Sequence, residues 1–279
     1  IEQCDVRGEL AYLDKSLQEV LTIHQYAPAV GDILGQFLTA AVLLSTTIKF
    51  EGRLVLQAQS EGEIPLMMAE CNSDLQVRGI ARGAEEAIGT EFSQLFASGH
   101  LAITIEPNKG QRYQGIVPLS GDNLGSCIEH YFENSEQLPT RLWLTGNNSH
   151  SAGLLLQQLP SQLVRDASER QLQWEHLCTL ADTVQDMELS ELESESLLRR
   201  LYTQDPLKIF PKEDVSFSCS CSRQRCLDAL ISMGAETCEE ILTEDGGINM
   251  DCEFCNQQYR FNRADLAQIL GPDEPQALH

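Results

Sequence analysis

The chain has 279 residues, of which 42% are hydrophobic, enough for a folded core and typical of about two domains. Forty-two acidic residues against nineteen basic ones give a formal net charge of −23. So negative a surface repels phosphate backbones and anionic lipids, and we therefore expect neither nucleic-acid binding nor membrane docking.

The N-terminal residues IEQCDVRGEL contain no basic segment followed by an apolar run, the pattern of a secretory signal. We therefore expect a cytoplasmic protein. The most apolar run, residues 33–50, is interrupted by Gln36 and Ser45. We interpret it as too short and too polar to span a bilayer, and it predicts a buried core helix instead.

Residues 1–165 predict an α+β body. Apolar residues at helical spacing predict an amphipathic helix over 10–24, a more buried helix over 30–47 and a third helix over 122–133. Short apolar runs separated by turn residues predict strands at 53–59, 65–71, 75–82, 100–106, 113–119, 140–144 and 153–159. Strands that follow one another beside segregated helices favour antiparallel sheets with packed helices.

Residues 166–214 predict an acidic helical linker. Between Asp182 and Glu195 there are six acidic residues and no basic one. Apolar residues nevertheless keep helical spacing, and Ser190 with Glu193 predicts a capping box. The apolar set is Trp174, Leu177, Ala181, Val184, Leu197, Leu198, Leu201 and Tyr202. Two interpretations stay open: an ordinary surface helix with solvated charges, or a connector that lies apolar side down on the body and can detach.

Residues 215–279 predict a small cysteine-rich unit. Ser222 is placed to cap a helix that ends at Met233, and Gly234 stops it. The sequence EDGGINM predicts a turn into a strand, and QYRF a second strand. Asn262 with Asp265 predicts the cap of a last helix.

Four cysteines in this unit have the spacing of a metal site: Cys219, Cys221, Cys252 and Cys255. Zinc binds four thiolates in a tetrahedron, and two close cysteine pairs on separate turns supply them. A unit of this size with few large apolar side chains also needs such a crosslink. The sequence therefore predicts one zinc ion. Of the remaining cysteines, Cys226 is either a spare ligand or, like Cys238, a small buried side chain.

The CxC spacing is unusual for zinc and leaves more than one chemistry open. Neighbouring thiols can close a tight disulfide, so the crowding permits a reduced, metal-bound state and an oxidised, metal-free state. Spacing alone favours a static structural zinc site. A third interpretation takes CEFC as the dithiol of an oxidoreductase. We expect no enzyme, because four cysteine ligands leave no position for water and no nucleotide-binding or hydrolase motif is present.

The sequence resembles the 33 kDa chaperonin family, the redox-regulated holdase chaperones of bacteria, over nearly its whole length. The resemblance rests on five stretches: VRGEL (6–10), RYQGIVPLSGD (112–122), SEQLPTRLWL (135–144), FSCSCSRQRC (217–226) and EDGGINMDCEFCNQQYRF (244–261). The combination of CxC and CxxC at this separation is specific to that family.

The resemblance implies that Cys219, Cys221, Cys252 and Cys255 bind zinc in a reduced, inactive form. It also implies disulfides Cys219–Cys221 and Cys252–Cys255 in an oxidised, active form that dimerises. Family members hold unfolding client proteins without ATP, which gives our hypothesis for this chain: oxidation releases zinc, the switch unit and the linker unfold, and clients bind. The alternative is a constitutive protein-binding module with a static structural zinc site.

Overall fold

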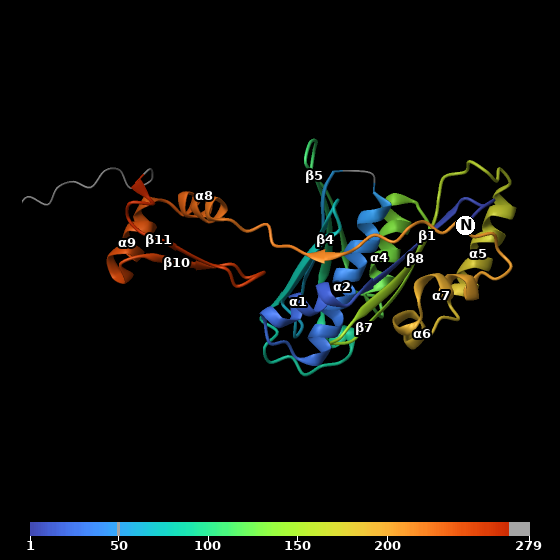
Figure 1. Cartoon of the computed structure of the whole chain (residues 1–279), viewed down its shortest axis with the longest axis horizontal. Helices are drawn as coiled ribbons and strands as arrows, with labels where there is room; N and C mark the ends of the chain where they lie inside the picture. The colour runs from blue at the N-terminus through green and yellow to red at the C-terminus, as the bar shows by residue number, and fades with distance from the viewer. Residues whose placement is uncertain (49–50, 268–279) are drawn as a thin grey trace, which may run out of the picture. The chain divides into compact units, whose positions relative to one another are not determined.

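The computed structural model describes residues 1–48 and 51–267. The chain divides into two compact units, Ile1–Ser218 and the part that begins at Cys219 (Figure 1). Both units mix helices with antiparallel strands, so the predicted α+β class is confirmed. The functional division into residues 1–165, 166–214 and 215–279 stays a prediction.

The first unit contains two sheets. The larger has the strand order β6-β5-β2-β3-β4-β9 and is antiparallel except at β4–β9. Its strands are β2 (Gly52–Gln59), β3 (Leu66–Asn72), β4 (Gln76–Arg82), β5 (His100–Pro107), β6 (Tyr113–Pro118) and β9 (Ser216–Phe217). A short helix, α3 (Phe92–Leu95), lies between β4 and β5 in the chain. The predicted strands of this sheet are confirmed, whereas β9 was not predicted.

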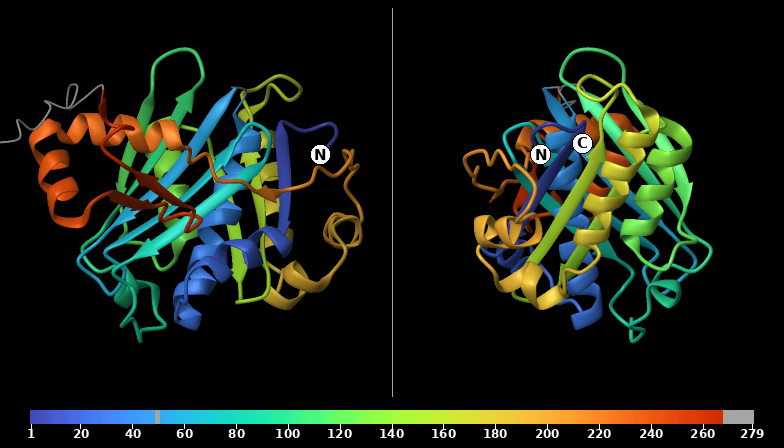
Figure 2. Two further views of the ribbon diagram at one scale, coloured as in Figure 1. Left: turned by 60° about the vertical axis from the view of Figure 1, so that its left-hand side comes forward. Right: turned by 90° about the vertical axis from the view of Figure 1, so that its right-hand side faces the viewer.

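The smaller sheet has the order β1-β8-β7 and is antiparallel, with β1 (Val6–Leu13), β7 (Thr140–Gly146) and β8 (Ser151–Gln158). Helix α2 (Pro28–Thr47) contacts strands of both sheets and so runs between them (Figure 2). Helix α4 (Leu124–Tyr131) packs against β6 and β7, and a π-helical turn, η1 (Phe132–Glu136), continues it. This arrangement gives one main core, shared by the sheets and α2.

Helix α2 is the apolar run of the sequence. It is long and apolar enough to cross a membrane by length and composition alone, so our argument that the run is too short was wrong. However, 78% of the apolar stretch is buried inside the protein, which confirms the predicted core helix. Its apolar character is explained by the two sheets that cover it.

The helix predicted over 10–24 is wrong in its first part. Residues up to Leu13 belong to β1, and α1 spans only Lys15–Ile23, with Asp14 as its N-cap. The side chain of Asp14 accepts a hydrogen bond from the Lys15 amide at 2.5 Å. Leu10, Leu13 and Leu17 fit a helical period locally, but pairing of β1 with β8 along its whole length overrides that local preference.

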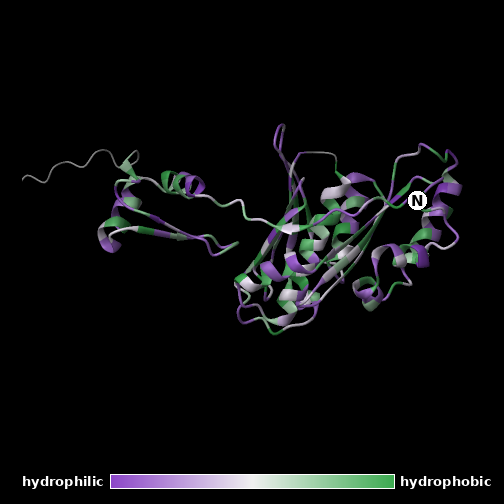
Figure 3. Cartoon of the chain, viewed as in Figure 1, coloured by the Kyte–Doolittle hydropathy of each residue, from purple (hydrophilic) through white to green (hydrophobic). Residues whose placement is uncertain are grey.

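The linker region forms three helices, α5 (Ala167–Ala181), α6 (Asp186–Glu191) and α7 (Ser194–Leu201), all within the first unit. Hydrophilic and hydrophobic stretches alternate along them (Figure 3). Their apolar side chains pack on the outer face of the smaller sheet. The buried members of this second cluster, here called the linker cluster, are Cys4, Val6, Ala152, Leu154, Leu156, Trp174, Leu177, Cys178, Ala181, Leu189, Leu197 and Tyr202.

The predicted capping box of Ser190 with Glu193 is wrong. Ser190 lies inside α6, where its hydroxyl donates to the carbonyl of Asp186 at 2.8 Å. Glu193 is itself the N-cap of α7 and accepts from the Ser196 amide at 3.0 Å. The reason is the extended backbone of Leu192, which divides the segment into two short helices.

The second unit contains α8 (Arg223–Met233), α9 (Ala235–Asp245) and the antiparallel hairpin β10 (Ile248–Asp251) and β11 (Gln258–Phe261). The cap at Ser222 and the stop at Gly234 are confirmed. Asn262 and Asp265 exchange capping hydrogen bonds as predicted, and the rest of the predicted last helix lies outside the described residues. Its buried core consists of Leu230, Cys238, Leu242, Ile248, Phe261 and Leu266.

Candidate metal centre

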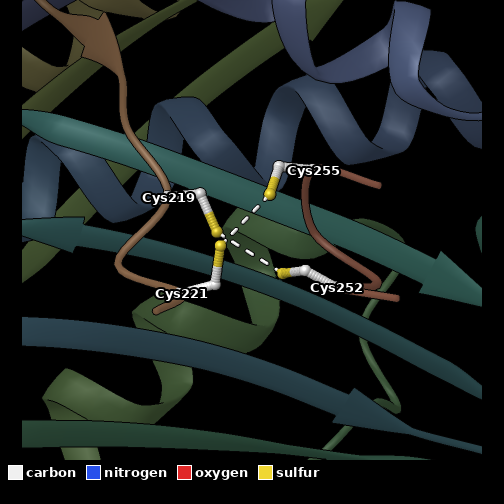
Figure 4. Close-up of side chains that lie close together, drawn as sticks. All are labelled: Cys219, Cys221, Cys252 and Cys255. Atoms are coloured by element: carbon white, nitrogen blue, oxygen red, sulfur yellow. Dashed lines mark hydrogen bonds between the residues drawn. The ribbon is translucent and has the colours of Figure 1, made fainter. Parts of the chain in front are cut away.

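The CxC pair lies in the extended segment between the end of β9 and the start of α8. The Ser222 side chain accepts from the Arg225 amide at 3.2 Å and so begins α8 directly after Cys221. The guanidinium of Arg225 donates to the Ser220 carbonyl at 3.1 Å and to its hydroxyl at 2.8 Å. The side chains of Cys219 and Cys221, which flank Ser220, point toward those of Cys252 and Cys255 (Figure 4).

The CxxC pair lies in the turn that joins β10 to β11. The Cys252 amide donates to the Gln257 carbonyl at 3.0 Å, and the Cys252 carbonyl accepts from Cys255 at 3.2 Å and from Asn256 at 2.7 Å. Asn256 has φ 54°, in the left-handed region that asparagine tolerates better than most residues. This tight turn directs both sulfurs to one side.

All four sulfur atoms lie within 4.8 Å of one another (Figure 4). The Cys219 and Cys252 sulfurs are 3.6 Å apart, and those of Cys221 and Cys255 are 3.4 Å apart. Four ligands at about 2.3 Å from a common centre, arranged as a tetrahedron, would be about 3.8 Å from one another. The cluster is therefore close to the dimensions of a four-thiolate metal site, and its residues can bind a metal ion.

The electrostatics of the cluster also fit a cation. Burial raises the pKa of Cys252 and of Cys255, and hydrogen bonding to neighbouring thiols raises the Cys255 pKa further. Burial also opposes ionisation of Cys221, but hydrogen bonds from Tyr259 and from the other thiols outweigh it and lower its pKa. Four adjacent thiolates repel one another, so a bound cation is what would keep them all ionised.

Tyr259 is a neighbour of the cluster that sequence reasoning did not single out. Its hydroxyl is 3.2 Å from the Cys221 sulfur, and the hydrogen bond to that sulfur is the largest cause of its raised pKa. Its position could have indicated this contact, because Tyr259 lies on β11, the strand that follows the CxxC turn, four residues after Cys255.

The other cysteines lie outside this group. Among the described residues, Cys219, Cys221, Cys252 and Cys255 form the one cluster with metal-ligand spacing. Cys238 is buried in the small core, as predicted, whereas Cys226 on α8 is only half-buried and packs against that core. The cysteines of the first unit are all buried: Cys4, Cys71, Cys127 and Cys178.

A family model described as "Hsp33 protein" matches residues 1–262 of the chain. The chain belongs to the Hsp33 family. It is 48% identical over 282 residues to the 33 kDa chaperonin of Pseudomonas aeruginosa (strain LESB58), covering 98% of this chain and 95% of the relative. It is 51% identical over 272 residues to the 33 kDa chaperonin of Azotobacter vinelandii, covering 96% and 92%.

The fold is also that of a solved Hsp33. The crystal structure of the 33 kDa chaperonin, a heat shock protein 33 homologue, from Thermotoga maritima superimposes with a TM-score of 0.83 at 20% identity. The match covers 95% of this chain and 93% of the other. The names of the relatives support a chaperone, and the four-cysteine cluster of this Hsp33 family member fits a metal or redox centre.

Proposed function

We propose that the protein is a redox-regulated, ATP-independent holdase chaperone of the cytoplasm, inactive while Cys219, Cys221, Cys252 and Cys255 hold one zinc ion. The observation that carries the proposal is the gathering of four sulfurs where two loops meet in a unit with a very small core. Structural zinc contributes roughly 10–16 kcal/mol of apparent binding free energy, as much as the whole stability of an ordinary domain. Loss of the metal should therefore unfold the second unit.

Zinc fits the donors, because thiolates are soft ligands and four of them match its tetrahedral preference. When bound, zinc keeps the thiolates ionised and holds the CxC and CxxC turns together. Because all four cysteines are only half-buried, small oxidants have access to the sulfurs.

Oxidation then proceeds on the cysteines themselves. One thiolate of a pair attacks hydrogen peroxide, giving a sulfenic acid and hydroxide, and its neighbour displaces a second hydroxide to form the disulfide. Formation of each disulfide thus consumes one hydrogen peroxide, whose oxygen atoms accept the two electrons that the two sulfurs lose. The family resemblance supports the pairs Cys219–Cys221 and Cys252–Cys255, which remove all four ligands and free the metal.

Release of apolar surface would follow in the first unit. Helices α5, α6 and α7 cover the apolar outer face of the smaller sheet through the linker cluster. If they detach once the second unit unfolds, that face and their own apolar sides become available to unfolding clients, and exposed apolar patches of several hundred Å² suit such binding. Dimerisation of the active form and the absence of enzymatic activity belong to the same proposal.

Aggregation of a heat-labile enzyme provides the test. Light scattering should be suppressed by the peroxide-treated protein and not by the reduced, zinc-loaded protein, and zinc release should run parallel with activation. A Cys255→Ser variant should lose zinc binding, whereas Cys226→Ser, a control in the same unit outside the cluster, should keep it. Equal activity in both redox states, with zinc retained after peroxide, would instead support a constitutive binding module with a static zinc site.

A further inference from the structure

Strand β9 occupies the outer edge of β4 at one end of the six-stranded sheet. It has only two residues and is parallel to β4, whereas every other neighbouring pair in the sheet is antiparallel. The Ser216 amide donates to the Leu75 carbonyl at 3.2 Å, and the Ser218 amide donates to the Val77 carbonyl at 3.1 Å. Without β9, this edge would present unpaired main-chain groups, which proteins usually cover.

Only a short part of the β4 edge can form main-chain hydrogen bonds with another strand. Hydrogen-bonding groups of successive strand residues point alternately to the two sides, so Val77, Gly79 and Ala81 point outward while Arg78 and Ile80 point toward β3. The Ala81 amide already donates to the Tyr26 hydroxyl at 3.3 Å. The edge that another strand can use therefore runs from Leu75 to Gly79.

The side chains of β9 show what this edge accepts. Val215 and Phe217 are half-buried and pack against the main core, while Ser216 between them is exposed. Helix α1 also contacts β9. The edge thus binds an extended segment with bulky apolar residues at positions i and i+2. That alternation is typical of strands, whose apolar side chains are buried in folded proteins and become exposed when the proteins unfold.

The segment that precedes β9 is held to the first unit by contacts outside the sheet: the Glu2 amide donates to the Pro206 carbonyl at 2.8 Å, Leu207 packs against the linker cluster, and Lys212 pairs with Glu193. Residues 206–215, which precede β9, have no helix or strand, and only Ser218 separates the strand from Cys219. While the four-cysteine unit is folded, the chain that follows β9 is ordered from Cys219 onward. When that unit unfolds, β9 joins a long disordered segment, and the conformational entropy it gains favours its release.

We propose that β9 is a built-in competitor that covers a peptide-binding edge and detaches when the four-cysteine unit unfolds. The β4 edge then pairs with an extended segment of an unfolding polypeptide that carries bulky apolar residues two positions apart, by main-chain hydrogen bonding. The inference rests on the proposed holdase function for its trigger and its clients. It adds a defined main-chain binding site to the broad apolar surface of the linker cluster.

Amide hydrogen exchange of the full chain, followed by NMR, tests the edge directly. The Val77 amide should exchange at least 10-fold faster in the oxidised, metal-free protein than in the reduced, zinc-loaded one, while the Ile80 amide, which faces β3, should not change. The synthetic peptide PLKIFPKEDVSFS, the sequence of residues 206–218, should slow exchange at Val77 again. A control peptide with serine in place of its valine and last phenylalanine should not.

Two variants separate release of β9 from unfolding of the body. Phe217→Ser should speed exchange at Val77 at least 10-fold, and allow the peptide to bind, even in the reduced, zinc-loaded protein. Phe210→Ser makes the same change at a residue that is 69% exposed in the preceding segment, and it should behave like the wild type. If Phe217→Ser disturbs the sheet itself, exchange at Ile80 will also rise, and the oxidised wild type then decides the question.

The outcomes distinguish this inference from the proposed function. Aggregation of a heat-labile enzyme is measured on the same samples. If the oxidised protein suppresses aggregation but Val77 stays protected or the peptide fails to bind, the edge proposal is wrong and the holdase function stands. If the Val77 amide loses protection on oxidation and regains it with the peptide, but aggregation is not suppressed, the edge proposal stands and the holdase proposal fails. Renewed protection on raising the protein concentration alone would assign the edge to a second copy and overturn the client assignment.

Discussion

Truncation of Leu177 to alanine should loosen the linker helices without disturbing the main core. Leu177 lies on α5, is 2% exposed and packs in the linker cluster between the helix and the smaller sheet. Removing a buried leucine side chain costs about 2–5 kcal/mol, because apolar contacts are lost and a cavity remains. Since every 1.4 kcal/mol is tenfold, the detached state of the helices should become about 30-fold to several thousandfold more populated.

Hydrogen exchange of peptides from residues 167–181 in the reduced, zinc-loaded protein measures this population. The Leu177→Ala variant should lose protection there by that factor, while peptides from α2 should not change. Leu172→Ala is the matched control, since Leu172 is on the same helix but 67% exposed, and surface changes are usually within about 0.5 kcal/mol. Less oxidant should then be needed for half-maximal suppression of aggregation.

Two results would refute this reasoning. If α5 in Leu177→Ala exchanged at the wild-type rate, the helix would not open as a separate element. If α2 lost as much protection as α5, the linker and the core would unfold together, and the linker cluster would not be a local switch.

Three further predictions concern the carboxylates of Asp182 and Asp5 and the thiol of Cys71. Asp182→Ala removes the acceptor of hydrogen bonds from Arg141 at 2.8 Å and Trp143 at 3.0 Å, and should lower α5 protection about 5-fold, the equivalent of about 1 kcal/mol, in the same exchange experiment. Asp5→Asn should flatten the fall of the thermal midpoint below about pH 4 compared with the wild type. Burial alone would raise the Asp5 pKa, but three backbone amides at residues 162–164 lower it below the ordinary value of 3.8, so its stabilisation is full above that value and is lost as the pH falls through the folded pKa. Burial raises the pKa of Cys71 to about 11, so iodoacetamide at pH 8 should label it only after denaturation, as mass spectrometry of tryptic peptides would show.

Each of these has a contrary outcome. Unchanged exchange in Asp182→Ala would mean that solvent replaces the lost hydrogen bonds. A wild-type pH profile in Asp5→Asn would mean that other carboxylates control acid stability. Labelling of native Cys71 would show that the interior of the first unit opens on the timescale of the reaction.

The local structure of the cysteine-rich unit could be predicted from the sequence because its signals are short-range. Ser222 and Gly234 begin and end α8 through contacts within a few residues, and the CxxC turn is set by its own hydrogen bonds. The meeting of Cys219 with Cys252 across 33 positions was inferred from metal chemistry instead, and the structure brings the two sulfurs together.

The errors fall where distant parts of the chain decide the structure. Residues 10–13, the end of β1, were predicted as helix because their apolar spacing fits both periods, and only the pairing of β1 with β8, more than a hundred residues away, resolves the ambiguity. β9 was missed for the same reason, since two residues carry no periodicity and exist as a strand only beside β4. The split of the acidic linker at Leu192 likewise has no strong breaker in the sequence.

Every residue of β8 is buried, which is unusual for a strand in a sheet of three. One side chain row, with Leu155, faces α2, and the other, with Leu154 and Leu156, faces the linker helices. The smaller sheet therefore contributes to two hydrophobic cores, and one of them is covered by the acidic linker helices. When the linker helices detach, the apolar outer face of the smaller sheet is exposed to solvent. The solubility of this open form will therefore depend on how quickly another apolar surface covers that face.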